Sequence, residues 1–229
     1  MTEKDKEHMR GIFKGPLLKL RETLLMMASL TDRNFTVAMN SLTERDASKG
    51  TLVEAEDTIV DKLEVDIDAM VVVYLSTHGA AATACRLVLA TSKISEALES
   101  IADQAVTIAR RSQKLCELPE LPLDLEIMPM AQLSLRMMRE GIDCFVDVAP
   151  DKVLDIVALD KKVDSKNREN ERVLCEIMSE HPDYVQQCIH YMLISRALER
   201  VGDYAKHIAQ EVYYLYMAED IRHRQLASS

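Results

Sequence analysis

The residues of this sequence best suited to chemistry are carboxylates that recur in pairs. Glu99 and Asp103 lie four residues apart, and Glu199 and Asp203 repeat that spacing after the same Ala-Leu dipeptide. Residues four apart share one face of a helix, where two like charges destabilise the helix by roughly 0.2–0.5 kcal/mol. A hard cation bound through oxygen ligands would offset this repulsion at both places.

A second set of carboxylates shows the same repetition earlier in each half of the chain. In an antiparallel helical hairpin, this set would face the first set across the seam between the two helices. Three or four converging oxygens in each half would form a metal site, and the alternative is a hydrated acidic groove that binds no ion tightly. The corresponding positions are Asp57 and Asp160, Asp61 and Asp164, and Glu64 and Asn167.

The composition predicts that helices position these carboxylates. Of 229 residues, 48% are apolar, aromatic residues are scarce, Trp is absent, and there are six Gly and six Pro, a balance typical of an all-α protein. Apolar residues at helical spacing predict helices over residues 16–43, 47–76 and 80–115, and over 128–147, 151–180 and 183–218. We expect Asp183 to cap the last of these helices.

A proline-containing segment near the middle of the chain separates the two sets of helices. Pro ends helices and biases the preceding residue away from helical geometry, so residues 116–129, with three prolines, are expected to hold a linker. The prediction is a first three-helix repeat over 1–117, a linker over 118–128 and a second repeat over 129–229. Together they would form a spectrin-repeat-like arrangement of six helices.

Charge and cysteine usage narrow the possible functions and locations. The net charge of −10 argues against non-specific binding to nucleic acid. Five widely spaced cysteines without a C-x-x-C are expected to be buried thiols in a reducing cytosol. The longest apolar run, 69–75, is far shorter than the about 18 residues of a membrane span. We therefore expect a soluble, cytoplasmic protein that reaches a membrane only through a partner.

No sequence signature of catalysis accompanies the carboxylates. A di-iron oxidase built in a helical bundle usually carries Glu-x-x-His on two helices, and this motif does not occur. A Gly-rich phosphate loop and a nucleophile elbow are also missing from the sequence. We therefore do not expect redox catalysis or direct phosphate chemistry. One alternative to a metal-binding protein is a helical adaptor whose acidic face serves protein contacts without an ion.

The sequence resembles the PhoU family of bacterial phosphate-transport regulators. Members of this family carry two three-helix-bundle repeats with an E/D-x-x-x-D motif on the third helix of each repeat. Residues 196–215, which include Ala-Leu-Glu-Arg-Val-Gly-Asp-Tyr-Ala, are similar to the C-terminal signature of the family. Segments 57–64, 93–110 and 160–164 also fit, so the resemblance covers almost the whole chain.

The resemblance implies a cytoplasmic, non-enzymatic regulator that keeps a phosphate-responsive two-component system inactive when phosphate is plentiful. Its implied partners are a sensor histidine kinase, the ATPase of a phosphate ABC transporter and a second copy in a homodimer. An accessory protein of another phosphate transporter is the alternative. The implied cofactors are divalent or trivalent ions of iron, manganese, magnesium or zinc. The implied ligands are Glu99, Asp103, Glu199 and Asp203, with further oxygens from Asp57, Asp61, Glu64, Asp160 and Asp164.

Several residues depart from the family pattern. Ser100 and Ala102 stand where the family usually has Arg and Gly, and Asn167 replaces an expected acidic residue. An amide offers an oxygen without a charge, so the second site is expected to be poorer in charge or to bind fewer ions. His207, one turn beyond Asp203, is expected to be a solvated neighbour more often than a nitrogen ligand.

Overall fold

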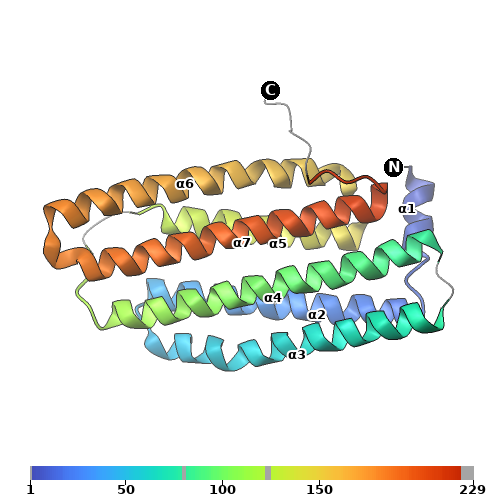
Figure 1. Cartoon of the computed structure of the whole chain (residues 1–229), viewed down its shortest axis with the longest axis horizontal. Coiled ribbons are helices and arrows are strands. Elements are labelled where there is room, and N and C mark those ends of the chain that lie inside the picture. The colour runs from blue at the N-terminus through green and yellow to red at the C-terminus, as the bar shows by residue number, and fades with distance from the viewer. Residues whose placement is uncertain (1, 79–80, 122–124, 223–229) are drawn as a thin grey trace.

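The computed structural model describes residues 2–78, 81–121 and 125–222, and within these ranges the chain is helical without strands. The all-α prediction is confirmed, with one three-helix repeat made of α2, α3 and α4 and another made of α5, α6 and α7 (Figure 1). The elements are α1 (Glu3–Arg10), α2 (Pro16–Thr43), α3 (Ala47–Thr77), α4 (Ala82–Cys116), α5 (Ile127–Asp147), η1 (Pro150–Lys152), α6 (Val153–Glu180), η2 (Pro182–Tyr184) and α7 (Val185–Met217).

Local chemistry sets where the predicted helices begin. Helix α2 starts at Pro16, which follows Gly15 in a positive-φ conformation (54°) that only glycine adopts readily. Helix α3 starts after Asp46, whose side chain accepts a hydrogen bond from the backbone N–H of Ser48 at 3.0 Å. The long helices agree with the predicted ranges to within a few residues because such signals lie in the sequence itself.

The structure differs from the sequence-based expectations at two helix starts. The prediction that Asp183 caps the last helix is wrong, because Pro182–Tyr184 forms a short 3-10 turn and Tyr184 precedes α7 without a side-chain cap. Helix α1 was not predicted, since its charged sequence lacks an apolar periodicity. It begins at a capping box in which Thr2 and Asp5 exchange hydrogen bonds.

The two repeats bury corresponding residues, which supports an internal duplication. Thr31 of α2 donates to the carbonyl of Leu98 at 3.4 Å, and Ser134 of α5 donates to the carbonyl of Leu198 at 3.0 Å. Buried apolar residues also match along the other helices. Corresponding buried pairs are Val53 and Ile156, Val60 and Val163, Ile94 and Ile194, Ala97 and Ala197, and Ile108 and Ile208.

Helices α4 and α7 run antiparallel and join the two repeats at the centre of the molecule (Figure 1). Lys93 of α4 reaches Glu211 of α7 at 3.1 Å, which fixes the register of this pair. A side-chain methyl at Gly202 would lie 3.1 Å from Val163, so the glycine allows α6 to pack closely against α7. One hydrophobic core runs through both repeats, and the outer helices α3 and α6 are therefore held rigidly against α4 and α7.

The cysteine prediction holds only in part. Cys144 and Cys188 are buried, but Cys175 is exposed, because it lies on the outward side of α6 next to buried Leu174. The five cysteines are free thiols. Across residues 2–78, 81–121 and 125–222, no helix has the length and apolar character needed to cross a membrane.

Candidate metal site

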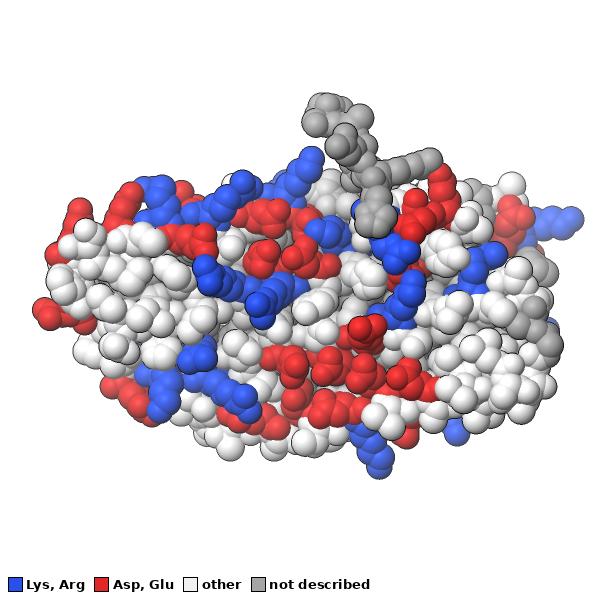
Figure 2. Space-filling model, in the orientation of Figure 1, with Lys and Arg blue, Asp and Glu red and all other residues white. Residues whose placement is uncertain are grey.

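The structure brings the predicted ligand residues together in two groups on one face of the molecule. The first acidic cluster lies on α3 and α4, and the second acidic cluster lies on α6 and α7 (Figure 2). Basic side chains surround the second cluster in this view, whereas a band of acidic side chains dominates the first. The first acidic cluster is Asp57, Asp61, Glu64, Glu99 and Asp103, and the second is Asp160, Asp164, Glu199 and Asp203.

The charges of the first acidic cluster act on one another. Burial raises the pKa of Glu99 to about 7, and the four other carboxylates of the cluster add to the rise. Burial likewise raises the pKa of Asp57 to about 6, with contributions from Asp61 and Asp103 and an opposing one from Arg110. The five side chains are therefore close enough for each added negative charge to be costly.

The first acidic cluster has no ion-pair partner within the described ranges. None of its five carboxylates lies within 4.0 Å of a Lys, Arg or His nitrogen there. Arg110, whose charge lowers the pKa of Asp57, donates instead to Glu54 at 3.1 Å. The Oδ1 atom of Asp57 is buried and has no hydrogen-bond partner. A buried acceptor without a partner is unusual in proteins, and a cation beside Asp57 would supply that partner.

The second acidic cluster contains its own cation. The Nζ atom of Lys206 lies 2.6 Å from Asp160 Oδ2 and 2.7 Å from Asp203 Oδ1, so it bridges α6 and α7. Burial disfavours the charge on Lys206, but the two carboxylates outweigh this effect and raise its pKa. Asp160 is only 9% exposed. The ammonium group therefore occupies the space between these two carboxylates.

Two other residues near the second acidic cluster are engaged elsewhere. The side-chain oxygen of Asn167 accepts a hydrogen bond from Ser195 at 2.8 Å, and Ser195 in turn accepts one from Asn170 at 3.0 Å. The His207 Nε2 atom lies 3.9 Å from Oε1 of Glu211, the residue of α7 that pairs with Lys93 of α4. The donor set of the second cluster is consequently poorer in free oxygens than that of the first.

The side chains of the clusters do not converge on a single point. In the part of the chain that the structure describes, no three His, Cys, Asp or Glu side chains are arranged to hold a metal ion. The first acidic cluster nevertheless fits a hard cation by its donor chemistry, since it offers oxygens alone. Asp61 and Asp103 are exposed, and exposed side chains change rotamer rapidly. In the second cluster, Lys206 competes with any bound cation.

Sequence reasoning missed three charged residues that shape these clusters. Asp68 and Glu96 both raise the pKa of Glu64, after burial as the largest cause, and so extend the first acidic cluster. Each lies one helical turn from a predicted ligand, Glu64 or Glu99, and the helical spacing could have identified it. Lys206 was also missed, although it stands where the first repeat has Val106.

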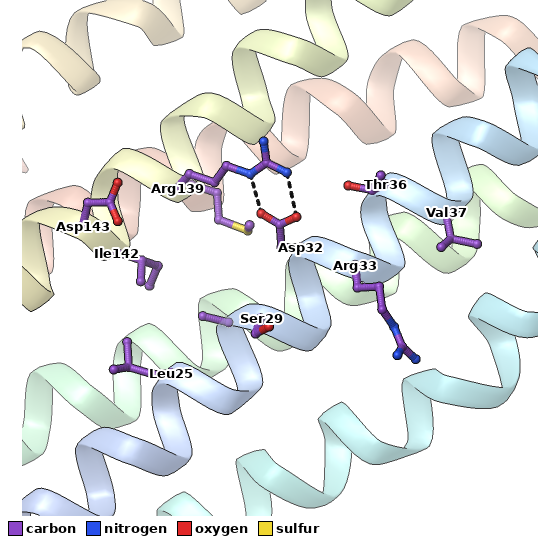
Figure 3. A pocket seen from close by; sticks show the side chains of 11 residues that line it. Leu25, Ser29, Asp32, Arg33, Thr36, Val37, Arg139, Ile142 and Asp143 are labelled. Carbon is purple, nitrogen blue, oxygen red and sulfur yellow. Dashed lines mark hydrogen bonds and ion pairs between the residues drawn. The ribbon is translucent and has the colours of Figure 1, made fainter.

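A separate pocket of about 540 Å³ lies between α2 and α5, helices that do not carry the acidic clusters (Figure 3). Arg139 spans this seam and donates two hydrogen bonds to Asp32, at 2.5 and 2.8 Å. The floor includes Leu25, Met138 and Ile142. Because its central charged pair is satisfied internally and none of the predicted ligand residues lines it, the pocket plays no part in the candidate metal site.

Comparison with known proteins finds relatives along nearly the whole chain. The PhoU domain family matches residues 24–112 and again residues 127–212. The phosphate-specific transport system accessory protein PhoU homolog of Pseudomonas aeruginosa is 32% identical over 226 residues, covering 97% of this chain and 93% of that protein. The phosphate-specific transport system accessory protein PhoU of Escherichia coli K12 is 25% identical over 217 residues, covering 95% and 90%.

Solved structures show the same fold. The crystal structure of PhoU from Pseudomonas aeruginosa superposes with a TM-score of 0.88 at 31% identity, covering 90% of this chain and all of that one. The phosphate transport system regulatory protein PhoU from Streptococcus pneumoniae superposes with a TM-score of 0.81 at 21% identity, a level that supports the fold alone. The two matched segments coincide with the two helical repeats.

Proposed function

The chain belongs to the PhoU family, and on this basis we propose that it is a non-enzymatic accessory protein that regulates phosphate uptake and binds cations through its first acidic cluster. The observation that supports cation binding is the group of five mutually repelling carboxylates, which have no ion-pair partner within the described residues. A hard divalent cation bound by several oxygens would relieve this repulsion.

The regulatory part of the proposal follows from the relatives, which are named as accessory proteins of the phosphate-specific transport system. By this likeness the protein acts in the cytoplasm, where it links a phosphate ABC transporter ATPase to a sensor histidine kinase and represses phosphate-starvation genes. A homodimer is part of the same proposal. Nucleic acid is not a proposed partner, since the net charge is −10.

The proposal places the ion in the groove between α3 and α4. Asp57, Glu99 and Asp103 would hold it from two helices, with Asp61 and Glu64 completing the oxygen set. Iron, manganese, magnesium and zinc are the candidate ions, and oxygen ligation favours the harder ones. The bound cation would supply positive charge and fix the two helices relative to each other.

The prediction that Asp160, Asp164, Glu199 and Asp203 also bind an ion stays a prediction. Lys206 supplies a positive charge between two of these carboxylates, so an ion there would have to displace its ammonium group. A second candidate function, an adaptor that holds no ion, is favoured by this internal cation and by the lack of a preformed three-ligand group among the described residues.

Metal analysis of matched double variants tests the cation proposal. Protein purified without chelators or a His-tag column is compared with Glu99→Ala/Asp103→Ala and with Glu199→Ala/Asp203→Ala. We expect the first pair to lose most of the bound metal and the second pair to lose little, while helicity by circular dichroism is unchanged. Equal metal content in the wild type and the first variant would contradict an ion at the first cluster, and a wild type without metal would support the ion-free adaptor.

A deletion strain tests the regulatory proposal separately. Deleting the gene should switch on phosphate-starvation genes in phosphate-rich medium, because the repressing link between transporter and kinase is lost. Complementation with the wild-type gene should restore repression. Wild-type repression in the deletion strain would argue for an accessory role in another phosphate transporter.

A further inference from the structure

The outward face of α3 carries an exposed apolar stripe. Val65, Val72 and Val73 are 65%, 66% and 59% exposed, and Ala69 between them is exposed as well. Val65, Ala69 and Val72 are spaced by four and three residues, so they lie on one face of the helix, and Val73 lies one turn beyond Ala69. These four residues are called the α3 stripe. Contiguous apolar surface of this kind is a common feature of interaction sites.

A shallow hollow adjoins the α3 stripe. It has a volume of about 240 Å³ and lies where the start of α2 meets the end of α3. Its lining is Ala69 and Val73 of the stripe together with Pro16, Lys19, Met70, Tyr74 and His78. An apolar hollow next to an apolar stripe gives a partner side chain a place to anchor, which is how helices dock in hydrophobic grooves.

The internal duplication shows that the fold does not need this stripe. The buried residues of α3 and α6 correspond, as Val60 and Val163 do, so the outward positions can be compared directly. Within α6, Arg172 donates to Glu169 at 2.7 Å and to Glu176 at 2.6 Å, forming a charged surface. The positions of α6 that correspond to Val65, Ala69, Val72 and Val73 are Arg168, Arg172, Cys175 and Glu176.

Acidic residues border the α3 stripe on both edges. At 3.6 residues per turn, Asp61 and Asp68 lie along one edge, and Asp66 lies along the other, one turn beyond the exposed Lys62. In Figure 2, the acidic band over α3 and α4 ends in an uncharged area near the C-terminal end of α3. A second copy of this acidic protein would bring like charges together at these edges, which disfavours self-association through the stripe.

We propose that the α3 stripe is the docking surface for an amphipathic helix of a partner protein, with apolar residues along its centre and Lys or Arg along both edges. The apolar centre covers the stripe and fills the hollow, and the basic edges pair with Asp66 and Asp68. Such charge complementarity favours rapid and selective association. This interaction goes beyond the proposed regulation of phosphate uptake and does not depend on a bound ion.

A synthetic helix tests the proposal directly. The probe is a fluorescent amphipathic peptide with Leu on its apolar face and Lys along both edges, and the matched control peptide has Glu in place of Lys. The variant Val65→Arg/Val73→Glu gives α3 the residues that α6 carries at these positions, and it leaves the net charge unchanged. We expect the Lys peptide to bind the variant at least about tenfold more weakly than the wild type, a loss of about 1.4 kcal/mol. The Glu peptide should not bind either protein.

Control variants show whether the loss of peptide binding is specific to the α3 stripe. Arg168→Ala/Glu176→Ala on α6 should bind the Lys peptide as the wild type does. The uncharged variant Val65→Ser/Val72→Ser should show the same loss of peptide binding with unchanged metal content, so failure of the docking proposal is distinguishable from failure of the cation proposal. It also replaces Val65→Arg/Val73→Glu if that variant does not fold.

Two results would overturn the proposal. One is equal affinity of the Lys peptide for the wild type and the folded stripe variant. The other is a wild-type dimer, measured by analytical ultracentrifugation, that Val65→Arg/Val73→Glu converts to a monomer, which would assign the stripe to a second copy of the chain. Both measurements use the full chain.

Discussion

The two acidic clusters occupy corresponding places on corresponding helices, but their charges are balanced in different ways. In the second cluster, Lys206 lies 2.6 and 2.7 Å from two carboxylates and bridges α6 to α7. In the first cluster, Val106 stands at the position of Lys206, and burial and mutual repulsion raise the pKa of Glu99 to about 7. The duplication therefore keeps the predicted ligand carboxylates at corresponding positions, but among the described residues only the second repeat has a basic residue paired with them.

Two further substitutions enlarge this difference. Glu96 in the first repeat corresponds to Arg196 in the second, and Arg196 lies 3.3 Å from Glu171. Glu64 corresponds to Asn167, whose oxygen accepts from Ser195. The first cluster thus has an excess of negative charge that calls for an external cation. In the second, Lys206 pairs with Asp160 and Asp203, while burial and neighbouring carboxylates still raise the pKa of Glu199.

Removing the internal cation should have the largest effect. The variant Lys206→Val places the residue of the first repeat in the second cluster and leaves buried Asp160 without its partner. We expect a loss of about 1–3 kcal/mol in the free energy of unfolding without metal, since an unpaired charge near the interior is costly. Urea unfolding measures this, and added manganese should restore part of the loss.

The matched control for that variant is Lys161→Val, an exposed position of α6. It should stay within about 0.5 kcal/mol of the wild type. If Lys206→Val is as stable as this control, the bridge between α6 and α7 contributes nothing and the comparison between the clusters loses its basis.

The reverse exchange should weaken cation binding in the first cluster. In Val106→Lys, the new ammonium group can reach the carboxylates as Lys206 does in the second repeat. We expect manganese to bind at least about tenfold more weakly by isothermal titration calorimetry, equivalent to about 1.4 kcal/mol. Leu89→Lys adds the same charge at an exposed position of α4 and should bind manganese nearly as the wild type does. Equal affinities in both variants would argue against an ion between α3 and α4.

The matched hydroxyl contacts in the two repeats should contribute slightly different amounts to the free energy of unfolding. Ser134→Ala removes a 3.0 Å hydrogen bond to the carbonyl of Leu198, and Thr31→Val removes a longer one of 3.4 Å to Leu98. We expect thermal unfolding to show a loss of about 1 kcal/mol for the serine variant and less for the threonine variant. The opposite order would contradict the ranking by hydrogen-bond length.

The pH dependence of stability should also report the first cluster. The folded pKa values of Asp57 and Glu99, about 6 and about 7, lie above their ordinary values of 3.8 and 4.5. Their stabilising contribution without metal is therefore fully present below a pH of 3.8, declines as the pH rises above these ordinary values, and is lost by a pH of about 7. Solvent screening keeps the change below about 1 kcal/mol. The unfolding midpoint should depend less on pH across this range in Glu99→Gln, or with saturating manganese, than in the wild type without metal. An identical pH dependence in Glu99→Gln would contradict the assignment.

Helical periodicity and local start signals made most of the fold predictable. Pro16 and Asp46 mark helix starts in the sequence. Each of the pairs Glu99/Asp103 and Glu199/Asp203 lies on one face of its helix because its two members are four residues apart. Helix α1 could not be predicted in the same way, because its stability depends on packing of Met9 against distant parts of the chain.

The balance of charge at each cluster was harder to predict. The direction in which Lys206 extends depends on the packing of α6 against α7, which the sequence pattern does not specify. The α3 stripe was missed for a related reason. Apolar residues on all sides of α3 left its outward face ambiguous until the buried positions, such as Val60 and Ile67, were known.

Anomalous X-ray diffraction from crystals grown with manganese tests the cation proposal most directly, because it locates the ion relative to both clusters. We expect an anomalous peak between α3 and α4, bordered by Asp57, Glu99 and Asp103, and an intact Lys206 bridge between Asp160 and Asp203. A manganese peak between Asp160 and Asp203 with Lys206 displaced, or an empty first cluster at saturating manganese, would contradict the proposal.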